Sequence, residues 1–325
     1  MFLGVDGGGT KTALCLITRD GRVAAQAHVA SSYYFSEGVG LVERVLRDGV
    51  GQVCADAGIS PRDIHHAFFG LPSYGESSGD LPALDAAPRA VLEHNRYACD
   101  NDMVCGWAGS LGGVDGINVI GGTGSMTYGE RAGRGARVGG WGELFSDEGS
   151  AYWVAVQGLN VFTRMSDGRL PEGPLLEVLR RHLGLGSDLD LVDVVLNRWQ
   201  GGRSEIAGLA RQVVEAAGLG DGHAVAVLDE AGRELALLVD ATRQRLGFTA
   251  DEAVPVSYSG GIFGAGAVLG AFGRELHALH GGYELRQPLY PPVVGAAIYA
   301  AKLAGSPLDD VALDRLRATP TPVDA

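Results

Sequence analysis

Cysteine is scarce in this sequence, and long apolar runs are absent. The four cysteines are Cys15, Cys54, Cys99 and Cys105, and they form no C-x-x-C pair or metal-finger spacing. No stretch reaches the roughly 18 uninterrupted apolar residues of a membrane-spanning helix. The first residues lack the basic and apolar regions of a signal peptide. We therefore expect a soluble cytoplasmic protein without a membrane partner.

A basic cluster is also missing. The chain has 26 Lys and Arg residues against 39 Asp and Glu residues, and its formal net charge is −13. A nucleic acid would require a strong local basic patch, but the arginines are scattered among acids. We expect no nucleic-acid partner and interpret the acidity as a solubilising surface. The length of 325 residues favours two domains of ordinary size.

Glycine, by contrast, is abundant, and three consecutive glycines lie in "FLGVDGGGTKT", residues 2–12. Backbone N–H groups can surround a phosphate where side chains do not intrude. The spacing does not match a Walker A loop, because Thr10 stands where that motif has its lysine. The following "ALCLIT" is short and rich in strand formers. We therefore predict a β-hairpin whose tip binds phosphate, with Asp6 beside it or serving only as a turn residue.

A second glycine cluster lies in "GINVIGGTGSMTYG", residues 116–129. It again reads as strand, small residues with a threonine, and strand. The two clusters are about a domain's length apart. This pattern predicts a duplicated fold in which each half offers one hairpin to phosphate. The alternative is two unrelated glycine hairpins in a glycine-rich chain.

Strands and helices are predicted to alternate between the two loops, whereas helices dominate after residue 150. A strand over "AVPVSYSGG" and a final helix over "PVVGAAIYAAKLAG" follow. The last residues, "RATPTPVDA", are expected to be frayed. The order of elements predicts an α/β fold with mixed sheets.

Three segments carry a family resemblance. The two glycine loops resemble the phosphate motifs of the ASKHA superfamily, which includes sugar kinases, Hsp70 and actin. The segment "SYSGGIFGAG", residues 257–266, resembles its adenosine-binding turn. The most specific segment, "GGWGELFSDEGSAYWVA", residues 139–155, is similar to N-acetylglucosamine kinases of the BadF/BadG/BcrA/BcrD group.

The resemblance implies a duplicated ribonuclease H-like fold of the actin, hexokinase and Hsp70 type. Two lobes with mixed sheets would flank a central cleft. The N-terminal lobe would span residues 1–115, with a helix at about 292–304 returning to it. The C-terminal lobe would span residues 116–291.

The resemblance also implies the activity and its residues. The chain would be a kinase that transfers the γ-phosphoryl group of ATP to a hydroxyl of an amino sugar, with Mg²⁺, and we expect a homodimer. Asp102 would be the catalytic base, and Asp6 would orient Mg²⁺ through water. The residues implied to bind ATP are Asp6, Gly8, Gly9, Thr10, Lys11, Thr123, Gly124, Ser125, Gly260 and Gly261. The residues implied to bind the sugar are Asn101, Gly140, Trp141, Gly142 and Asp147.

Simpler roles remain open for several of these residues. Asp102 precedes a helix and suits a helix N-cap, and a base at that position would be held still by the same geometry. Asp147 and Glu148 suit the cap of a helix beginning at Gly149. Trp141 could be an ordinary core residue rather than a lining of the sugar site.

One departure from the family concerns the acceptor. Family members that use N-acetylglucosamine usually have an Asn near residue 33, but here "SSYYFSEG" places Tyr33 or Tyr34 there. We therefore expect a different sugar, or an acceptor that stacks on tyrosine.

A second function class is an ATP-driven activator of a dehydratase or reductase that carries an iron–sulfur cluster. Such a cluster requires thiolates brought together, here across a dimer. Cys99 and Cys105 flank Asp102 without a recognisable cluster spacing. The sugar-kinase segment favours the kinase.

Overall fold

Two five-stranded sheets organise the computed structural model, which describes residues 1–319. Unit 1 joins Met1–Gly116 to the chain from Arg286 onward, and unit 2 is Ile117–Leu285. Each unit has its own sheet and its own buried core. No helix among residues 1–319 is long and apolar enough to cross a membrane.

The sheet of unit 1 has the order β3-β2-β1-β4-β5. Its first three strands are antiparallel, whereas β4 and β5 run parallel to β1. Parallel strands bring their carboxyl ends to one edge of a sheet, which is where ligands bind in α/β folds. The strands are β1 (Phe2–Gly7), β2 (Lys11–Ile17), β3 (Val23–Ala30), β4 (His66–Leu71) and β5 (Tyr97–Asn101).

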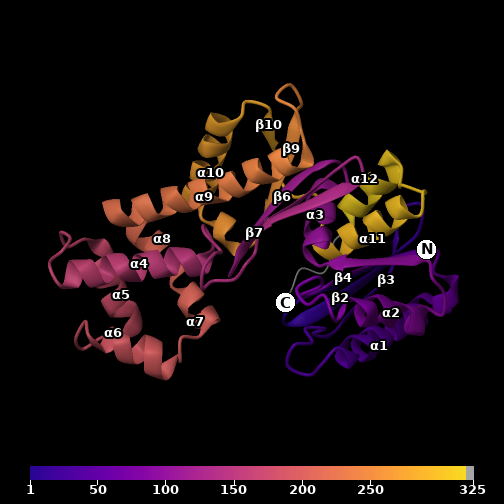
Figure 1. The fold of residues 1–325 in the computed structure, drawn as a ribbon, viewed down its shortest axis with the longest axis horizontal. Coiled ribbons are helices and arrows are strands. Elements are labelled where there is room, and N and C mark those ends of the chain that lie inside the picture. The colour runs from indigo at the N-terminus through magenta and orange to yellow at the C-terminus, as the bar shows by residue number, and fades with distance from the viewer. Residues whose placement is uncertain (320–325) are drawn as a thin grey trace. The chain divides into compact units, whose positions relative to one another are not determined.

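Helices cover both faces of this sheet. Figure 1 shows α11 and α12 on one side of the strands, and α1 and α2 on the other. Helix α11 approaches β1 so closely that a Cβ at Gly4 would lie 2.3 Å from the backbone nitrogen of Ala297, so only glycine fits there. The helices are α1 (Gly40–Ala57), η1 (Pro61–Asp63), α2 (Leu81–Leu92), α3 (Met103–Leu111), α11 (Pro292–Leu303) and α12 (Asp310–Ala318).

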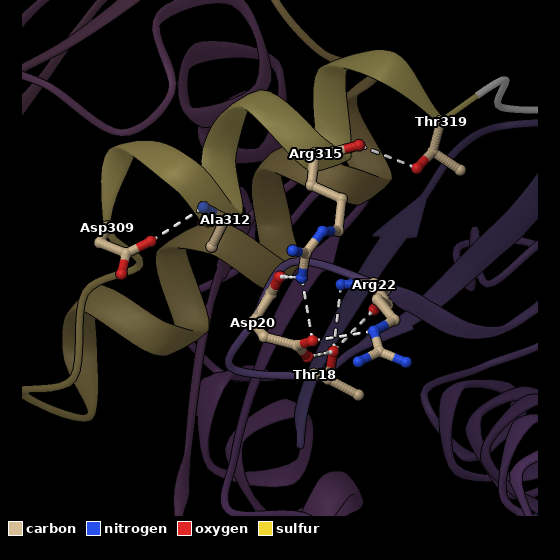
Figure 2. Close-up of polar contacts among 7 residues, drawn as sticks. All are labelled: Thr18, Asp20, Arg22, Asp309, Ala312, Arg315 and Thr319. Atoms are coloured by element: carbon tan, nitrogen blue, oxygen red, sulfur yellow. Dashed lines mark hydrogen bonds and ion pairs between the residues drawn. The ribbon is translucent and has the colours of Figure 1, made fainter.

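Helix α12 contacts the turn between β2 and β3 through Arg315 and Asp20 (Figure 2). Arg315 donates 2.6 Å to the backbone carbonyl of Asp20 and lies 2.9 Å from its carboxylate. Asp309 starts the helix by accepting a hydrogen bond of 2.8 Å from the Ala312 N–H. The sequence pattern did not predict this helix, and the tail expected to be frayed is helical as far as Ala318. Residues 320–325, the rest of the tail that was predicted to be frayed, lie outside the described residues.

The sheet of unit 2 has the order β10-β9-β6-β7-β8. Strands β6, β9 and β10 are parallel, and β7 and β8 are antiparallel. Numbered within its own unit, each sheet has the order 3-2-1-4-5, so the predicted duplication and the predicted α/β class with mixed sheets are confirmed. The strands are β6 (Gly116–Gly121), β7 (Ser125–Arg131), β8 (Arg134–Gly139), β9 (Val254–Ser259) and β10 (Tyr283–Leu285).

Helices make up most of the rest of unit 2. The long helix α9 packs on β7 and β8, and α10 packs on α9. The helix predicted over "EIAGLARQVVEAAG" is interrupted at Leu209, which is buried and separates α7 from α8. The helices are α4 (Ala151–Ser166), α5 (Pro174–Leu183), α6 (Asp190–Val192), η2 (Asp193–Arg198), α7 (Arg203–Gly208), α8 (Ala210–Gly218), α9 (Gly222–Leu246), η3 (Gly261–Gly264) and α10 (Gly266–Leu279).

Candidate active site

The first glycine loop is the tip of the β1–β2 hairpin, as predicted. The Gly8 N–H donates 2.9 Å to the carbonyl of Lys11 and closes the turn. Among residues 1–319, apart from its two chain neighbours, no atom would lie within 4 Å of a Cβ added at Gly9. The described residues therefore leave the space beside Gly9 open to a ligand. The roles of Gly8, Gly9, Thr10 and Lys11 in binding ATP stay predictions.

The segment after β3 is tied to this hairpin. The Ser31 hydroxyl donates 2.7 Å to the carbonyl of Gly8. Of the two tyrosines that follow, Tyr34 is buried and its hydroxyl donates to Asp80, whereas Tyr33 is 42% exposed. Tyr33 is therefore the tyrosine of this segment that is free to meet a ligand.

Asp6 and Asp102 lie at the carboxyl edge of the unit 1 sheet. Asp6 is on β1, beside Gly70 of β4, and Asp102 follows β5. A Cβ at Gly70 would lie 3.1 Å from the Asp102 Cα and 2.2 Å from the Cys105 sulfur. Glycine at this position lets the start of α3 sit directly against β4. The sheet thus brings together two carboxylates that are far apart in sequence.

The electrostatics of Asp6 reflect this arrangement. Burial of its carboxylate, followed by the negative charge of Asp102, raises the pKa of Asp6 to about 7, against the opposing effects of a Cys105 hydrogen bond and the Lys11 charge. A cation would favour the ionised form. The residues fit Mg²⁺, which keeps several waters and binds through one or two carboxylates. Among residues 1–319 no group of three or more His, Cys, Asp or Glu side chains could hold a metal by itself.

A helix-capping role does not explain why an aspartate stands at position 102. It occupies the N-cap position of α3, but its side chain makes no capping hydrogen bond with that helix. Asn101 does so instead, because its Oδ1 accepts 3.2 Å from the Met103 N–H. The Asn101 amide also donates 3.2 Å to the carbonyl of Tyr74. Asn101 thus holds the turn that presents Asp102, and its contact with a sugar stays a prediction.

The second glycine loop is the β6–β7 connection of unit 2. The Ala151 N–H at the start of α4 donates 2.9 Å to the Gly122 carbonyl. The Ser125 hydroxyl donates 2.6 Å to the carbonyl of Glu148. Gly260 has a φ of +96°, and a Cβ there would lie 2.4 Å from the Gly121 carbonyl oxygen. The turn after β9 therefore packs against the second glycine loop, and this contact requires glycine at position 260.

A pocket of about 580 Å³ opens beside this loop within unit 2. Thr123 and Gly261 line it, and both were predicted to bind ATP. One wall of the pocket comes from α7 and α8. None of its residues was among the predicted site residues, although small residues at helical spacing in α7 could have indicated a wall that contacts a ligand. The lining residues are Gly122, Thr123, Ala151, Ser204, Ala207, Gly208, Ala210, Arg211, Val214, Gly261, Ile262, Gly264 and Ala265.

The segment from Gly140 to Asp147, which we call the acceptor segment because it is predicted to contact the sugar, follows β8. It is an irregular loop with left-handed backbone at Gly140 (φ 72°), Gly142 (φ 97°) and Asp147 (φ 62°). Trp141 is 74% exposed, so the interpretation of Trp141 as a core residue is wrong. Its side chain is available for a ligand.

Asp147 is buried, unlike its neighbours in the acceptor segment. Burial raises the pKa of its carboxyl, whereas the Ser125 N–H and Arg203 act in the opposite direction. Arg203 lies 2.5 Å from the carboxylate and 56 residues away in the chain, and no sequence pattern could have indicated it. Neither Asp147 nor Glu148 caps the next helix, because the Ser150 hydroxyl accepts 3.1 Å from the Trp153 N–H.

Comparisons with known proteins identify the family of this chain. The model of the BadF/BadG/BcrA/BcrD ATPase family matches residues 3–300. The chain is 28% identical over 314 residues to the N-acetyl-D-glucosamine kinase of Dictyostelium discoideum, covering 92% of this chain and 97% of that protein. It is 30% identical over 267 residues to the N-acetylmuramic acid/N-acetylglucosamine kinase of Clostridium acetobutylicum, covering 80% of this chain and 84% of that protein.

The fold is shared with a crystal structure from Chromobacterium violaceum described as that of a candidate N-acetylglucosamine kinase. The TM-score is 0.67 at 24% identity, and the match covers 93% of this chain and 98% of that one.

Proposed function

This chain belongs to the BadF/BadG/BcrA/BcrD ATPase family, and we propose that it is an ATP-dependent kinase that phosphorylates a hydroxyl of an amino sugar such as glucosamine or N-acetylglucosamine. The observation that carries the proposal is the pair Asp6 and Asp102 at the edge of the unit 1 sheet, next to the open β1–β2 hairpin. Two relatives, named as kinases of N-acetyl-D-glucosamine and of N-acetylmuramic acid and N-acetylglucosamine, support the acceptor class.

The nucleotide is proposed to bind through both glycine loops. In unit 2, the pocket beside Thr123 and Gly261 is large enough for a nucleoside and would hold the adenosine. Backbone N–H groups of the two loops would bind the phosphates. Bound Mg²⁺, oriented by Asp6, would neutralise charge on the phosphates.

Asp102 is proposed to aim the acceptor hydroxyl and to accept its proton as the bond to phosphorus forms. The acceptor segment, through Trp141 and Asp147, is proposed to contact the sugar. A kinase needs little covalent chemistry from its side chains, because positioning and charge neutralisation supply most of the acceleration. The proposed residues supply these two effects.

We also propose that the kinase acts in the cytoplasm, where ATP is supplied, and that it is a homodimer. Size-exclusion chromatography with light scattering tests the assembly. A monomer of 33.8 kDa at micromolar concentration would contradict the homodimer.

An ADP-release assay with a panel of sugars tests the kinase proposal. We expect ADP release to require an amino sugar and Mg²⁺, and to be lost in Asp102→Asn. ADP release that proceeds equally without any sugar would contradict the proposal. Iron in protein purified without oxygen would favour the activator of a dehydratase or reductase.

A further inference from the structure

Arg203 forms ion pairs with two carboxylates of the acceptor segment. At the start of α7, its guanidinium lies 2.5 Å from Asp147 and 3.1 Å from Glu143. The Asp147 side chain is only 3% exposed, whereas the Arg203 side chain is 41% exposed. A half-exposed ion pair contributes little by itself, but a buried carboxylate without its partner is unfavourable. The Ser125 N–H and Arg203 together compensate for the burial of the Asp147 carboxylate.

The same ion pair lies on the second phosphate loop. A Cβ at Gly124 would be 2.6 Å from the Arg203 guanidinium and 2.6 Å from the Asp147 carboxylate. The Ser125 N–H also donates to Asp147. Asp147 itself has a left-handed φ of 62°, which is unfavourable for a residue other than glycine and persists only when its surroundings fix it. Arg203, Asp147 and the phosphate loop therefore form one packed cluster.

Helix α7 connects this cluster to the nucleotide pocket. Directly after Arg203, the residues Ser204, Ala207 and Gly208 line the pocket wall. The helix has only six residues and is interrupted at Leu209. A ligand that packs on this wall would fix the short helix and, with it, the side chain at its first position.

We propose that Arg203 is a positioning residue that couples nucleotide binding to acceptor binding within unit 2. This inference rests on the proposed kinase function and adds a coupling between its two substrates. Arg203 holds Asp147 and Glu143 in the geometry that binds the sugar. Nucleotide packed on the pocket wall stabilises α7, the helix that carries Arg203. By thermodynamic reciprocity, the sugar must strengthen nucleotide binding by the same factor.

Calorimetry on the full chain tests the coupling. We would titrate N-acetylglucosamine and glucosamine with and without a non-hydrolysable ATP analogue and Mg²⁺. In the unchanged protein we expect the analogue to tighten sugar binding by about 5-fold or more, the lower end of usual coupling. Arg203→Gln should reduce that factor to near one, whereas Arg203→Lys, which keeps the charge, should restore part of it.

Kinase kinetics provide a second readout. Arg203→Gln should raise the acceptor KM by about tenfold with a much smaller change in the ATP KM, because the pocket wall itself is unaltered. Glu143→Gln, which removes only the weaker of the two pairs, should give the same pattern to a lesser degree. Arg198→Gln is the matched control, because this arginine pairs with Asp193 and lies outside the cluster.

The outcomes separate this inference from the kinase proposal. If the unchanged protein phosphorylates an amino sugar but the analogue leaves sugar affinity unaltered, the coupling is wrong and the kinase stands. If Arg203→Gln keeps full coupling, Arg203 is not the residue that couples the two sites, and the kinase proposal still stands. If Arg203→Gln does not fold, Arg203→Lys and Glu143→Gln test the proposal in its place. The proposal is overturned if these two variants lose no more coupling than the control Arg198→Gln.

Discussion

The two glycine hairpins occupy the same place in sheets of the same strand order, yet their surroundings differ. In unit 1 the tip at Gly9 is open, and no protein atom would lie within 4 Å of an added Cβ. In unit 2 the tip at Gly124 is enclosed by Arg203 and Asp147. Side-chain contacts within its own unit therefore constrain Gly124 of the second loop but not Gly9 of the first. Duplication preserved the hairpin, and each unit supplied a different environment.

The units also differ in what they place beside the hairpin. Unit 1 places two carboxylates there, Asp6 and Asp102, and their mutual repulsion contributes to the raised pKa of Asp6. Unit 2 places a pocket of about 580 Å³. This division suggests that unit 1 contributes the acid–base and metal chemistry and that unit 2 contributes most of the nucleotide affinity. The following experiments test that division.

The largest effect is expected for Asp102→Asn in unit 1. The substitution keeps the size of the side chain and removes the charge that would accept the proton. Turnover should fall by about 10² to 10⁴, as is usual for loss of a general base. ATP affinity, measured by calorimetry, and the melting temperature should stay close to those of the unchanged protein. Near-normal turnover would remove Asp102 from the mechanism, and Asp147 would then be the next base to test.

The second test compares the two hairpins directly. Gly9→Val should weaken ATP binding about tenfold or more, because a branched side chain would stand where a phosphate is proposed to bind. Gly124→Val should weaken it by a similar factor for another reason, because its side chain would meet Arg203 and Asp147 and displace the loop. Only Gly124→Val should also lower the free energy of unfolding, by about 1–3 kcal/mol, because it overpacks the cluster with Arg203 and Asp147. Calorimetry and urea denaturation measure the two quantities.

The matched control for this pair is Gly51→Val, at an exposed position of α1 with no atom within 4 Å of the added Cβ. It should leave ATP affinity unchanged. If Gly9→Val binds ATP normally while folded, the first loop is not a phosphate loop. If Gly124→Val is as stable as Gly9→Val, the contrast between the hairpins is wrong.

A third prediction concerns the pH dependence of stability in unit 1 without metal or nucleotide. The pKa of Asp6 is about 7 in the folded chain, above its ordinary value of 3.8. Between these values the folded state holds a proton that the unfolded state has released, so this group makes stability fall as pH rises. Asp6→Asn removes that loss and should be more stable than the unchanged protein at pH 8, by about 1–3 kcal/mol.

Urea denaturation at pH 4 and pH 8 measures this difference, which should nearly vanish at pH 4. A difference of the same size at both pH values would show that the titration of Asp6 is not its cause. Asp115→Asn, at an acid outside the carboxyl edge, is the control for a generic effect of removing one charge.

The smallest effect is expected at Tyr33. Because Tyr33 is exposed and Tyr34 is buried, acceptor choice should respond to Tyr33→Asn and not to Tyr34→Phe. Asparagine offers both a donor and an acceptor, so Tyr33→Asn should sharpen discrimination between hydroxyl epimers by a few-fold, about 1 kcal/mol. The ratio of kcat/KM for two epimeric sugars measures it. Strict N-acetylglucosamine specificity in the unchanged protein would contradict the premise.

Much of the fold could be predicted because its information is local. The runs around Gly7–Gly9 and Gly121–Gly124 specify hairpins through small residues between strand formers, and helical spacing specified most helices. Helix α12 was missed although Asp309 is a local N-cap signal. Its docking could not be predicted, because it depends on Arg315 meeting Asp20, nearly 300 residues earlier. The break at Leu209 was missed because this leucine continues the apolar pattern of the helix and its backbone stays in the right-handed region.

The sequence by itself determined the two glycine hairpins, the acceptor segment and the candidate residues Asp6, Asp102 and Asp147, because these are properties of neighbouring residues and of backbone freedom at glycine. The tertiary structure decided which of two adjacent tyrosines is exposed, that Asn101 rather than Asp102 caps α3, and that Arg203 meets Asp147 across 56 residues. Such contacts depend on how sheets and helices pack, and packing joins positions that have no fixed spacing in the chain.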